Sequence, residues 1–188
     1  MSTGTRRSWA EANRIAHDLR ALFDLCYDEW IIAGSIRRKK PDVGDAEHVV
    51  RPRIGQAAVT DGLFTQIKPV NLLWKRIDEL VADGTLTKHL YGGTGFRWGE
   101  KYRGAEFGGM LHEIFLCDGE NRGAVTLIRT GPAEYSKRVV DAFNAIGTLR
   151  QQDGYLRYVS TGEIVPVPDE QTYFKLAGIP WVEPEDRR

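Results

Sequence analysis

The sequence predicts an α+β fold, and three observations support this class. Residues 8–27 repeat apolar side chains at spacings of three and four, which is typical of an amphipathic helix. Residues 29–51 contain two short apolar segments around a basic, proline-containing connector, as expected for two strands. Residues 85–116 alternate extended segments with glycine-rich turns, the pattern of antiparallel strands.

The first helix is expected to run from Ser8 to about Tyr27. Ser8, followed three residues later by Glu11, matches a capping box, in which the serine side chain accepts a hydrogen bond from a backbone N–H of the first turn. The apolar face of this helix consists of Ala12, Ile15, Leu19, Leu22, Phe23 and Cys26. Cys26 is therefore interpreted as a reduced thiol in the core.

The remaining elements follow in order. A helix is expected within residues 60–83, most clearly in VNLLWKRIDELVADG, which Gly84 can end as the residue after the cap. The expected strands after it are TLTKHLY, FRWGEKYRG and GGMLHEIFLC, and then come a helix in AEYSKRVVDAFNAIG, a hairpin in YLRYVSTGEIVPV and a short helix in DEQTYFKLAG. The polar break GENR places the expected boundary near Asp118, between domains 1–118 and 119–188.

The composition limits the possible classes of protein. Hydrophobic residues make up 41% of the 188, so a core can form. Since 26 basic residues balance 26 acidic ones, any affinity for phosphate must come from local patches. The two cysteines show no metal-type spacing. Because no apolar run approaches the roughly 20 residues of a membrane span, and no signal-peptide pattern is present, a cytoplasmic protein is expected.

Two carboxylates, Asp45 and Glu47, stand one residue apart on the second expected strand. Alternation along a strand points both side chains to the same face. One interpretation is a solvated strand edge; the other is a site for a divalent cation, since such ions prefer oxygen ligands. A two-metal site needs a third carboxylate. Glu113, in LHEIFLCD, is the candidate, because this strand can lie beside DAEHVV and its apolar residues place it inside the sheet. A carboxylate at that depth has to be paired or metal-bound.

Gly34 and Ser35 end the first strand and precede the basic run RRKK. A glycine turn lets backbone N–H groups approach an anion, and the serine hydroxyl adds a donor. Arg37 and Arg38 can supply charge-assisted hydrogen bonds to phosphate oxygens. A solvated basic loop is the alternative, and it applies most to the two lysines of the run.

The segment GSIRRKKPDVGDAE resembles the nucleotidyltransferase signature of the family X DNA polymerases, the polymerase-β type, in which Gly-Ser-x-Arg-Arg precedes Gly-Asp-x-Asp. Glu113 stands where that family has its third metal carboxylate. IRTGPAEYSKRV resembles the Tyr-Phe-Thr-Gly-Ser segment at the start of the thumb, and GEIVPVPDEQTYFKLAGIPWVEPEDRR resembles the closing segment of the family. The resemblance covers roughly residues 8–188. It implies a palm, with a mixed sheet and helices on one face, followed by a small α/β thumb.

The resemblance further implies the roles of individual residues. Asp45, Glu47 and Glu113 would hold two Mg²⁺ or Mn²⁺ ions. Gly34, Ser35 and Arg38 would hold the triphosphate. Thr130 and Gly131 would cradle the nucleotide, with a cis peptide bond between Gly131 and Pro132.

The implied activity is the addition of a nucleoside monophosphate from a (d)NTP to a 3′-hydroxyl, with release of pyrophosphate. The expected partners are the (d)NTP and DNA with a 3′-end or a gap, as in DNA repair, with RNA as a further possible acceptor and no membrane. We expect a monomeric, small stand-alone form, of palm and thumb alone, in the cytosol of a bacterium or of a phage-infected host.

The sequence departs from the family pattern at two places. The second and third carboxylates are glutamates where the polymerases have aspartates, and Ile128 and Arg129 replace the aromatic pair before Thr-Gly. Two rival functions stay open. The two glutamates favour a catalytically impaired protein that binds nucleotide or nucleic acid on the same scaffold. The zero net charge and the missing DNA-gripping region of the family leave open a nucleotidyltransferase that modifies a protein or a small molecule.

Overall fold

The computed structural model describes residues 6–61 and 64–188. Its helices are α1 (Trp9–Ala21), α2 (Gly34–Arg37), α3 (Leu72–Ala82), α4 (Arg122–Thr130), α5 (Ala133–Ile146), α6 (Glu170–Leu176) and the 3₁₀ turn η1 (Pro184–Asp186). Its strands are β1 (Arg7–Ser8), β2 (Tyr27–Ile32), β3 (Asp42–Val43), β4 (Asp45–Pro52), β5 (Ile54–Asp61), β6 (Phe64–Asn71), β7 (Thr87–Lys88), β8 (Leu90–Tyr91), β9 (Gly95–Phe96), β10 (Tyr102–Phe107), β11 (Met110–Leu116), β12 (Leu149–Gln152), β13 (Tyr155–Tyr158) and β14 (Ile164–Val165).

A five-stranded sheet in the order β2-β4-β11-β10-β7 forms the centre of the first part of the chain. Strands β4 and β11 pair in parallel, whereas the other neighbours pair antiparallel. The sheet is therefore mixed, and the α+β class expected from the sequence is confirmed. The expected pairing of β11 beside β4 is also confirmed.

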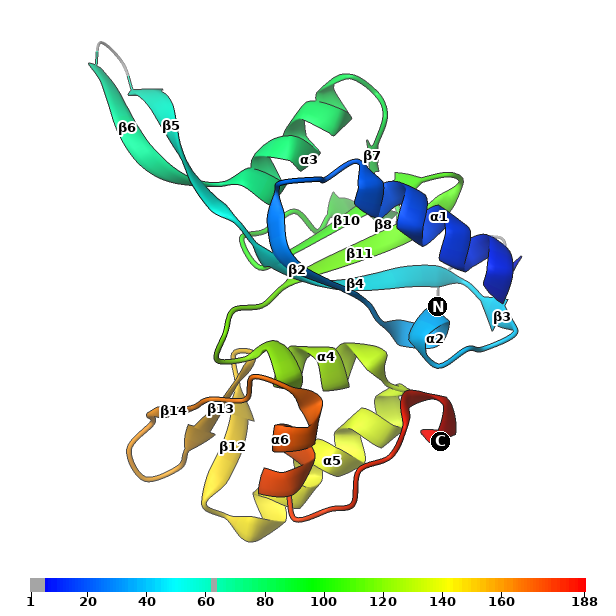
Figure 1. Cartoon of the computed structure of the whole chain (residues 1–188), viewed down its shortest axis with the longest axis vertical. Helices are drawn as coiled ribbons and strands as arrows, with labels where there is room; N and C mark the ends of the chain where they lie inside the picture. The colour runs from blue at the N-terminus through cyan, green and yellow to red at the C-terminus, as the bar shows by residue number, and fades with distance from the viewer. Residues whose placement is uncertain (1–5, 62–63) are drawn as a thin grey trace.

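Alternation along β4 sends its side chains to two different environments. Ala46 and Val50 point to the face that α1 and α3 cover, where both are fully buried. Asp45, Glu47 and Val49 point to the opposite face, and there Val49 packs with Val125 of α4. Figure 1 shows this arrangement, with α1 and α3 on one side of the sheet and α4 on the other.

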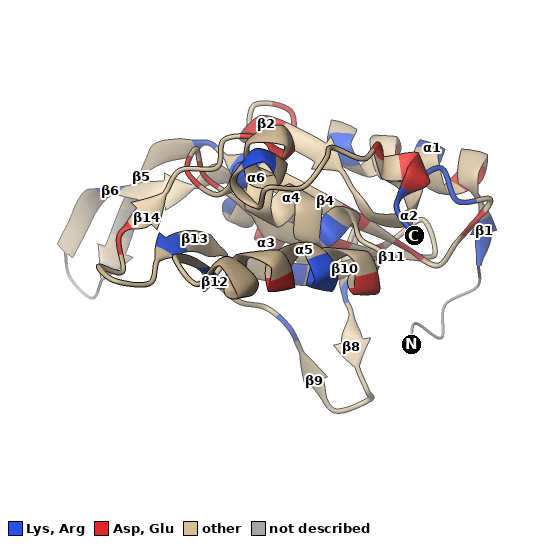
Figure 2. Ribbon diagram, turned by 90° about the horizontal axis from the view of Figure 1, so that it is seen from below, with Lys and Arg blue, Asp and Glu red and all other residues tan. Residues whose placement is uncertain are grey.

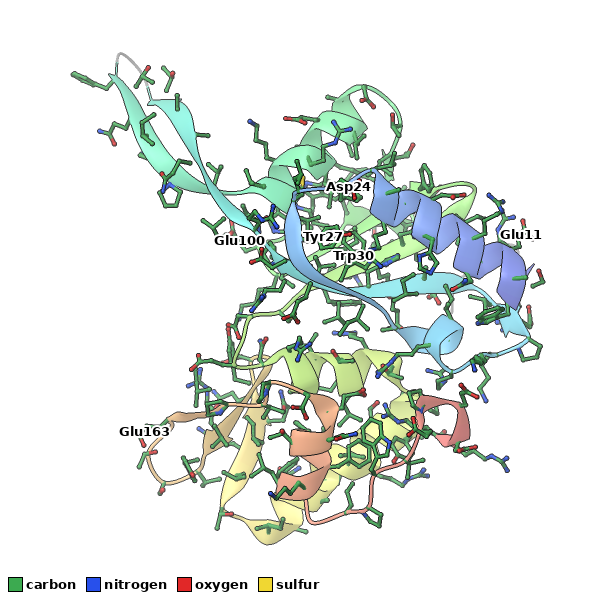
Figure 3. All side chains as sticks on the ribbon, in the orientation of Figure 1. Glu11, Asp24, Tyr27, Trp30, Glu100 and Glu163 are labelled. Carbon is green, nitrogen blue, oxygen red and sulfur yellow. The ribbon has the colours of Figure 1, made fainter. Side chains whose placement is uncertain are left out.

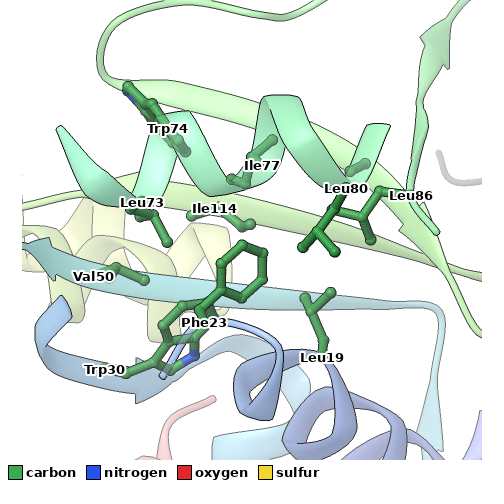
Figure 4. Close-up of a cluster of buried hydrophobic side chains, with 11 residues drawn as sticks. Leu19, Phe23, Trp30, Val50, Leu73, Trp74, Ile77, Leu80, Leu86 and Ile114 are labelled. Carbon is green, nitrogen blue, oxygen red and sulfur yellow. The ribbon is translucent and has the colours of Figure 1, made fainter. Parts of the chain in front are cut away.

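A cluster of buried hydrophobic side chains lies between α3 and the sheet (Figure 4). Leu73, Ile77 and Leu80 recur at helical spacing on α3 and are almost completely buried. They meet Phe23 and Trp30, whose rings stack with centroids 5.5 Å apart. This core holds β2, β4 and β11 in register, and β4 and β11 carry the three carboxylates on their other face.

The N-terminus of α1 agrees with the sequence, but its C-terminus does not. Ser8 caps the helix and accepts a hydrogen bond from the backbone N–H of Glu11. The helix ends at Ala21, so the expected extension to Tyr27 was wrong. The chain turns over residues 22–26, with Leu25 in the left-handed region (φ 70°), because Tyr27 already pairs with β4 as the first residue of β2. Cys26 is free and partly buried.

The hairpin of β5 and β6 was not foreseen, and it projects from the body in Figure 1. The helix expected within residues 60–83 is confined to α3, capped by Asn71 and followed by Gly84 at φ 81°, as predicted. The expected extended segments at 85–117 are broken into β7–β11. Figure 2 shows the short β8–β9 hairpin extending away from the rest of the chain.

The second part of the chain has a core of its own. Helices α4, α5 and α6 pack with the β12-β13-β14 sheet around Leu127, Phe143, Leu156 and Tyr173. Helix α5, the hairpin of β13 and β14, and α6 were predicted, whereas α4 and β12 were missed. The boundary expected near Asp118 falls between β11 and α4.

The peptide bond between Gly131 and Pro132, which joins α4 to α5, is cis, as expected.

Among the described residues, no helix is both long and apolar enough to cross a membrane.

Candidate functional site

The register of the central sheet brings the three candidate carboxylates to one face. Glu113 pairs directly with Glu47 across the parallel strands, and Leu111, two residues before Glu113, pairs with Asp45. Because side chains two residues apart share a face, Asp45, Glu47 and Glu113 all lie on the face opposite α1 and α3. The central place of β11 in the sheet, expected from its apolar residues, is confirmed.

Burial and mutual repulsion make this face unfavourable for negative charge. Burial, and then the charges of Asp45 and Glu113, raise the pKa of Glu47 to about 8. Burial also raises the pKa of Asp45, and the charge of Glu113 adds to the effect. The positive charges of Arg38 and Arg129 oppose the rise at Glu47 without cancelling it. The cluster therefore favours a bound cation or proton.

Gly34 touches this cluster from the start of α2. Its φ of 62° lies in the left-handed region, and a Cβ atom there would overlap with Oε2 of Glu47. Residue 34 must therefore be glycine for α2 to lie directly against the carboxylate. Ser35 follows in the first turn of α2 and is half-buried.

The arginines after Ser35 tie the two parts of the chain together. Arg37 donates to Oγ1 of Thr130 (2.7 Å) and pairs with Glu170 of α6 (Nη2 to Oε2, 2.5 Å). Arg38 donates to the backbone carbonyl of Thr130, and its Nε is buried without a partner among the described residues. Thr130, the last residue of α4, thus connects α4 to α2, and its hydroxyl is engaged. Lys39, at the surface, pairs with Glu185.

Two tyrosines that sequence reasoning missed bind Glu113. The hydroxyl of Tyr102 donates to Oε1 of Glu113 at 2.5 Å, and that of Tyr91 donates to the same oxygen at 3.0 Å. Gly104 is the antiparallel partner of Glu113, and a Cβ atom on it would overlap with the Tyr91 hydroxyl. The missing side chain at Gly104 therefore makes room for Tyr91 beside the carboxylate.

Two cavities open on this face. The Glu113 cavity, of about 560 Å³, is lined by residues that include Arg97, Lys101, Tyr102, Glu113, Phe115 and Arg129. The Glu47 cavity, of about 520 Å³, is lined by residues that include Arg38, Glu47, Arg129, Gly131, Ser136 and Lys137. Each cavity thus contains one of the carboxylates together with several cations. Thr130 lines neither cavity, whereas the neighbouring Gly131 lines the second.

The carboxylates match a divalent cation in chemical type, because hard cations prefer oxygen ligands. The nearby arginines do not offset the burial and the mutual repulsion of Asp45 and Glu47. Within residues 6–61 and 64–188, however, no three Asp, Glu, His or Cys side chains are grouped so that they could hold a metal ion as they stand. The backbone places the three carboxylates on one face, but in the described part of the chain their side chains do not form such a group.

The opposite face of the same strands carries a buried polar chain. Nε1 of Trp30 donates to Nδ1 of His48 (2.9 Å), and Nε2 of His48 lies 3.0 Å from Nδ1 of His112. Burial lowers the pKa of both histidines, that of His112 to about 4. Both are therefore neutral at pH 7 and belong to the core, not to the carboxylate site.

Comparison of the sequence with models of protein families finds no match, and neither does comparison with curated proteins. The functional interpretation of the site therefore depends on its own geometry and chemistry.

Proposed function

We propose that the protein is a minimal nucleotidyltransferase of the polymerase-β type, which transfers a nucleoside monophosphate from a (d)NTP to a 3′-hydroxyl. One observation carries the proposal. Asp45, Glu47 and Glu113 share one face of neighbouring strands, and cation-lined cavities open beside Glu47 and beside Glu113. A reaction between two substrates needs two adjoining binding sites of this kind.

The Glu47 cavity suits the nucleotide. Arg38 and Lys137 supply positive charge for a triphosphate, and Arg38 is a planar donor suited to phosphate oxygens. Gly131 adds a wall without a side chain, which lets a sugar approach closely. The volume of about 520 Å³ lies in the range usual for small-molecule sites.

The Glu113 cavity suits the acceptor. Arg97 and Lys101 supply charge for a phosphate backbone. Glu113 lies in the wall of this cavity, where it can accept the proton of the attacking hydroxyl. The zero net charge of the chain means that these local cations, and not the whole molecule, attract the acceptor.

The reaction transfers one nucleotidyl group. The 3′-oxygen attacks the α-phosphorus, the bond from this phosphorus to the α,β-bridging oxygen breaks, and pyrophosphate leaves with that oxygen. Mg²⁺ or Mn²⁺ held by Asp45, Glu47 and Glu113 would supply charge stabilisation for the attacking and leaving oxygens. The residues of the chain position the triphosphate, hold the acceptor and accept the proton.

The test is incubation of the protein with α-labelled nucleotides, Mn²⁺ and a set of acceptors: gapped DNA, single-stranded DNA and single-stranded RNA. The proposal expects label on a 3′-end, and no label with Asp45→Ala. If wild-type protein binds nucleotide but labels no nucleic acid, the proposal is wrong. The function is then either that of an impaired binding protein or that of a transferase with a protein or small-molecule acceptor. A gel shift with gapped DNA at two salt concentrations gives an independent result, since phosphate contacts impose a steep loss of affinity with salt.

A further inference from the structure

Arg129 lies where the two cavities meet. Among the residues that line the Glu47 cavity and those that line the Glu113 cavity, Ile128 and Arg129 belong to both sets. Ile128 is uncharged, so Arg129 is the shared residue that can bind an anion. Its place at the end of α4 puts it on the wall between two otherwise separate spaces.

The guanidinium of Arg129 is held in place but has no acceptor. It stacks over the ring of Phe115 with 3.6 Å between Cζ and the ring centroid, and Phe115 itself stacks on Tyr102 (4.6 Å between centroids). In the described part of the chain no hydrogen bond or ion pair is formed by this guanidinium. Arg37 and Arg38, by contrast, are bound to Thr130. Arg129 is therefore a positioned cation whose five N–H donors are available to a ligand.

The chemistry of the proposed function decides which ligand this is. A nucleotidyl group that passes from a donor in one cavity to an acceptor in the other must have its α-phosphorus at the boundary between them. The non-bridging oxygens of that phosphate gain negative charge as the 3′-oxygen attacks, and a planar guanidinium can donate to two such oxygens at once. The β- and γ-phosphates would then lie further into the donor cavity, which Arg38 lines.

We propose that Arg129 is a catalytic residue that donates hydrogen bonds to the non-bridging oxygens of the α-phosphate during transfer. This inference rests on the proposed function and adds a residue to it. The bonds made and broken are those of the transfer itself: the 3′-oxygen bonds to the α-phosphorus, pyrophosphate departs, and the hydroxyl proton passes to Glu113. Arg129 stays protonated throughout, because its side chain does not lose its proton in proteins.

A structural role is the alternative. A cation in the last turn of α4 is favourable to the helix dipole, and the charge of Arg129 also limits the rise that burial causes in the pKa of Glu47. If these were its only roles, removal of the charge would change stability and metal affinity but not the chemical step.

The test compares Arg129→Gln and Arg129→Lys with wild type, and Arg14→Gln, an exposed arginine on α1, serves as the matched control. The inference expects kcat to fall about 10²–10³-fold in Arg129→Gln, the loss typical when one donor to a transition-state anion is removed. Binding of a non-hydrolysable triphosphate, measured by calorimetry, should change less than about tenfold. Arg129→Lys should recover part of the rate, and Arg14→Gln should match wild type.

Replacement of one non-bridging α-oxygen by sulfur sharpens the test. Sulfur is a poorer acceptor than oxygen, so wild type should be slowed by one or both diastereomers of the α-thiotriphosphate, and Arg129→Gln should be slowed less. The inference is overturned if kcat is unchanged in Arg129→Gln, or if sulfur slows wild type and Arg129→Gln equally. In either case, nucleotide transfer by wild type would leave the proposed function intact. Absence of transfer by wild type to every acceptor overturns both.

Discussion

Glu47 and Glu113 lie directly opposite each other on the parallel strands β4 and β11. Asp45 shares their face, and burial together with repulsion raises the pKa of Asp45 and of Glu47. A sheet that brings three carboxylates to one partly buried face is destabilised there unless a cation is bound. The same arrangement provides oxygen ligands between two cavities, so a local cost in stability and a proposed catalytic role have one structural origin.

Glu47→Gln should stabilise the metal-free protein, and increasingly so as the pH rises. The pKa of Glu47 is about 8 in the folded protein against about 4.5 when exposed, so between these values the folded state holds a proton that the unfolded state lacks. The contribution of Glu47 to the free energy of unfolding therefore falls as pH rises from about 4.5 to 8. Urea unfolding in EDTA should show that the advantage of the variant grows by at least about 1.4 kcal/mol, the equivalent of one pKa unit, between pH 5 and 8.5. Glu100→Gln, at an exposed position labelled in Figure 3, is the control. If the free energy of unfolding changed with pH in the same way for Glu47→Gln and wild type, the electrostatic account would be contradicted.

Mn²⁺ should raise the melting temperature of wild type but not of Asp45→Ala. A ligand at a hundred times its Kd adds about 2.7 kcal/mol to the stability of the folded state, and each kcal/mol corresponds to roughly 2–4 °C for a chain of this size. Scanning calorimetry with and without the ion measures the shift. Asp18→Ala, on the surface of α1, removes a carboxylate outside the site and should keep the full shift. An equal shift in Asp45→Ala would place the ion elsewhere.

Tyr102→Phe should weaken the site without unfolding it. The substitution removes the 2.5 Å hydrogen bond to Glu113 and keeps the ring, which stacks on Phe115. Loss of a group that orients a metal ligand typically costs about 10–100-fold in metal affinity or activity, and we expect a loss in this range in the Kd for Mn²⁺. Tyr158→Phe, on the exposed end of β13, is the control. If both variants bind Mn²⁺ equally well, the tyrosine hydroxyls do not position Glu113.

Glu170→Gln should destabilise the fold strongly. Glu170 is buried and pairs with Arg37 and with Arg187, whose side chain is completely buried. Removal of one partner from a buried ion pair leaves an uncompensated charge, and we expect a loss of about 3–5 kcal/mol in the free energy of unfolding. Glu163→Gln, in the exposed loop between β13 and β14 (Figure 3), should stay within about 0.5 kcal/mol of wild type. If the free energy of unfolding fell only slightly in Glu170→Gln, water would have to solvate Arg37 and Arg187 in place of the carboxylate.

Elements with their own local signals were predicted from sequence, whereas those decided by tertiary contacts were not. The Ser8 cap, α3 with Gly84 after it, and the carboxylate-bearing strands all follow from capping, periodicity and alternation. The end of α1 could not be predicted in this way, because the helical spacing of apolar residues continues past Ala21, whereas strand pairing begins at Tyr27. Helix α4 was missed because its β-branched residues and its Gly123 are poor helix formers, and burial against both parts of the chain stabilises it.

The candidate site divides in the same way. The spacing of Asp45 and Glu47, and the apolar strand around Glu113, were sufficient to predict a shared face. Tyr91 and Tyr102 could not be found, because Tyr91 reaches the carboxylate only through the space left by Gly104 on a neighbouring strand. Only one sequence signal pointed to Arg129: it stands where the polymerases have an aromatic residue before Thr-Gly. That signal did not indicate that Arg129 lies between two cavities.

A crystal structure with Mn²⁺ and a non-hydrolysable nucleoside triphosphate tests the central claim most directly. Anomalous scattering locates the ions independently of the model, and electron density locates the phosphates. The account predicts an anomalous peak within bonding distance of Asp45 and Glu47, with Glu113 turned toward an ion and the triphosphate beside Arg38 in the Glu47 cavity. Ions bound away from Asp45 and Glu47, or a triphosphate outside that cavity, would contradict it.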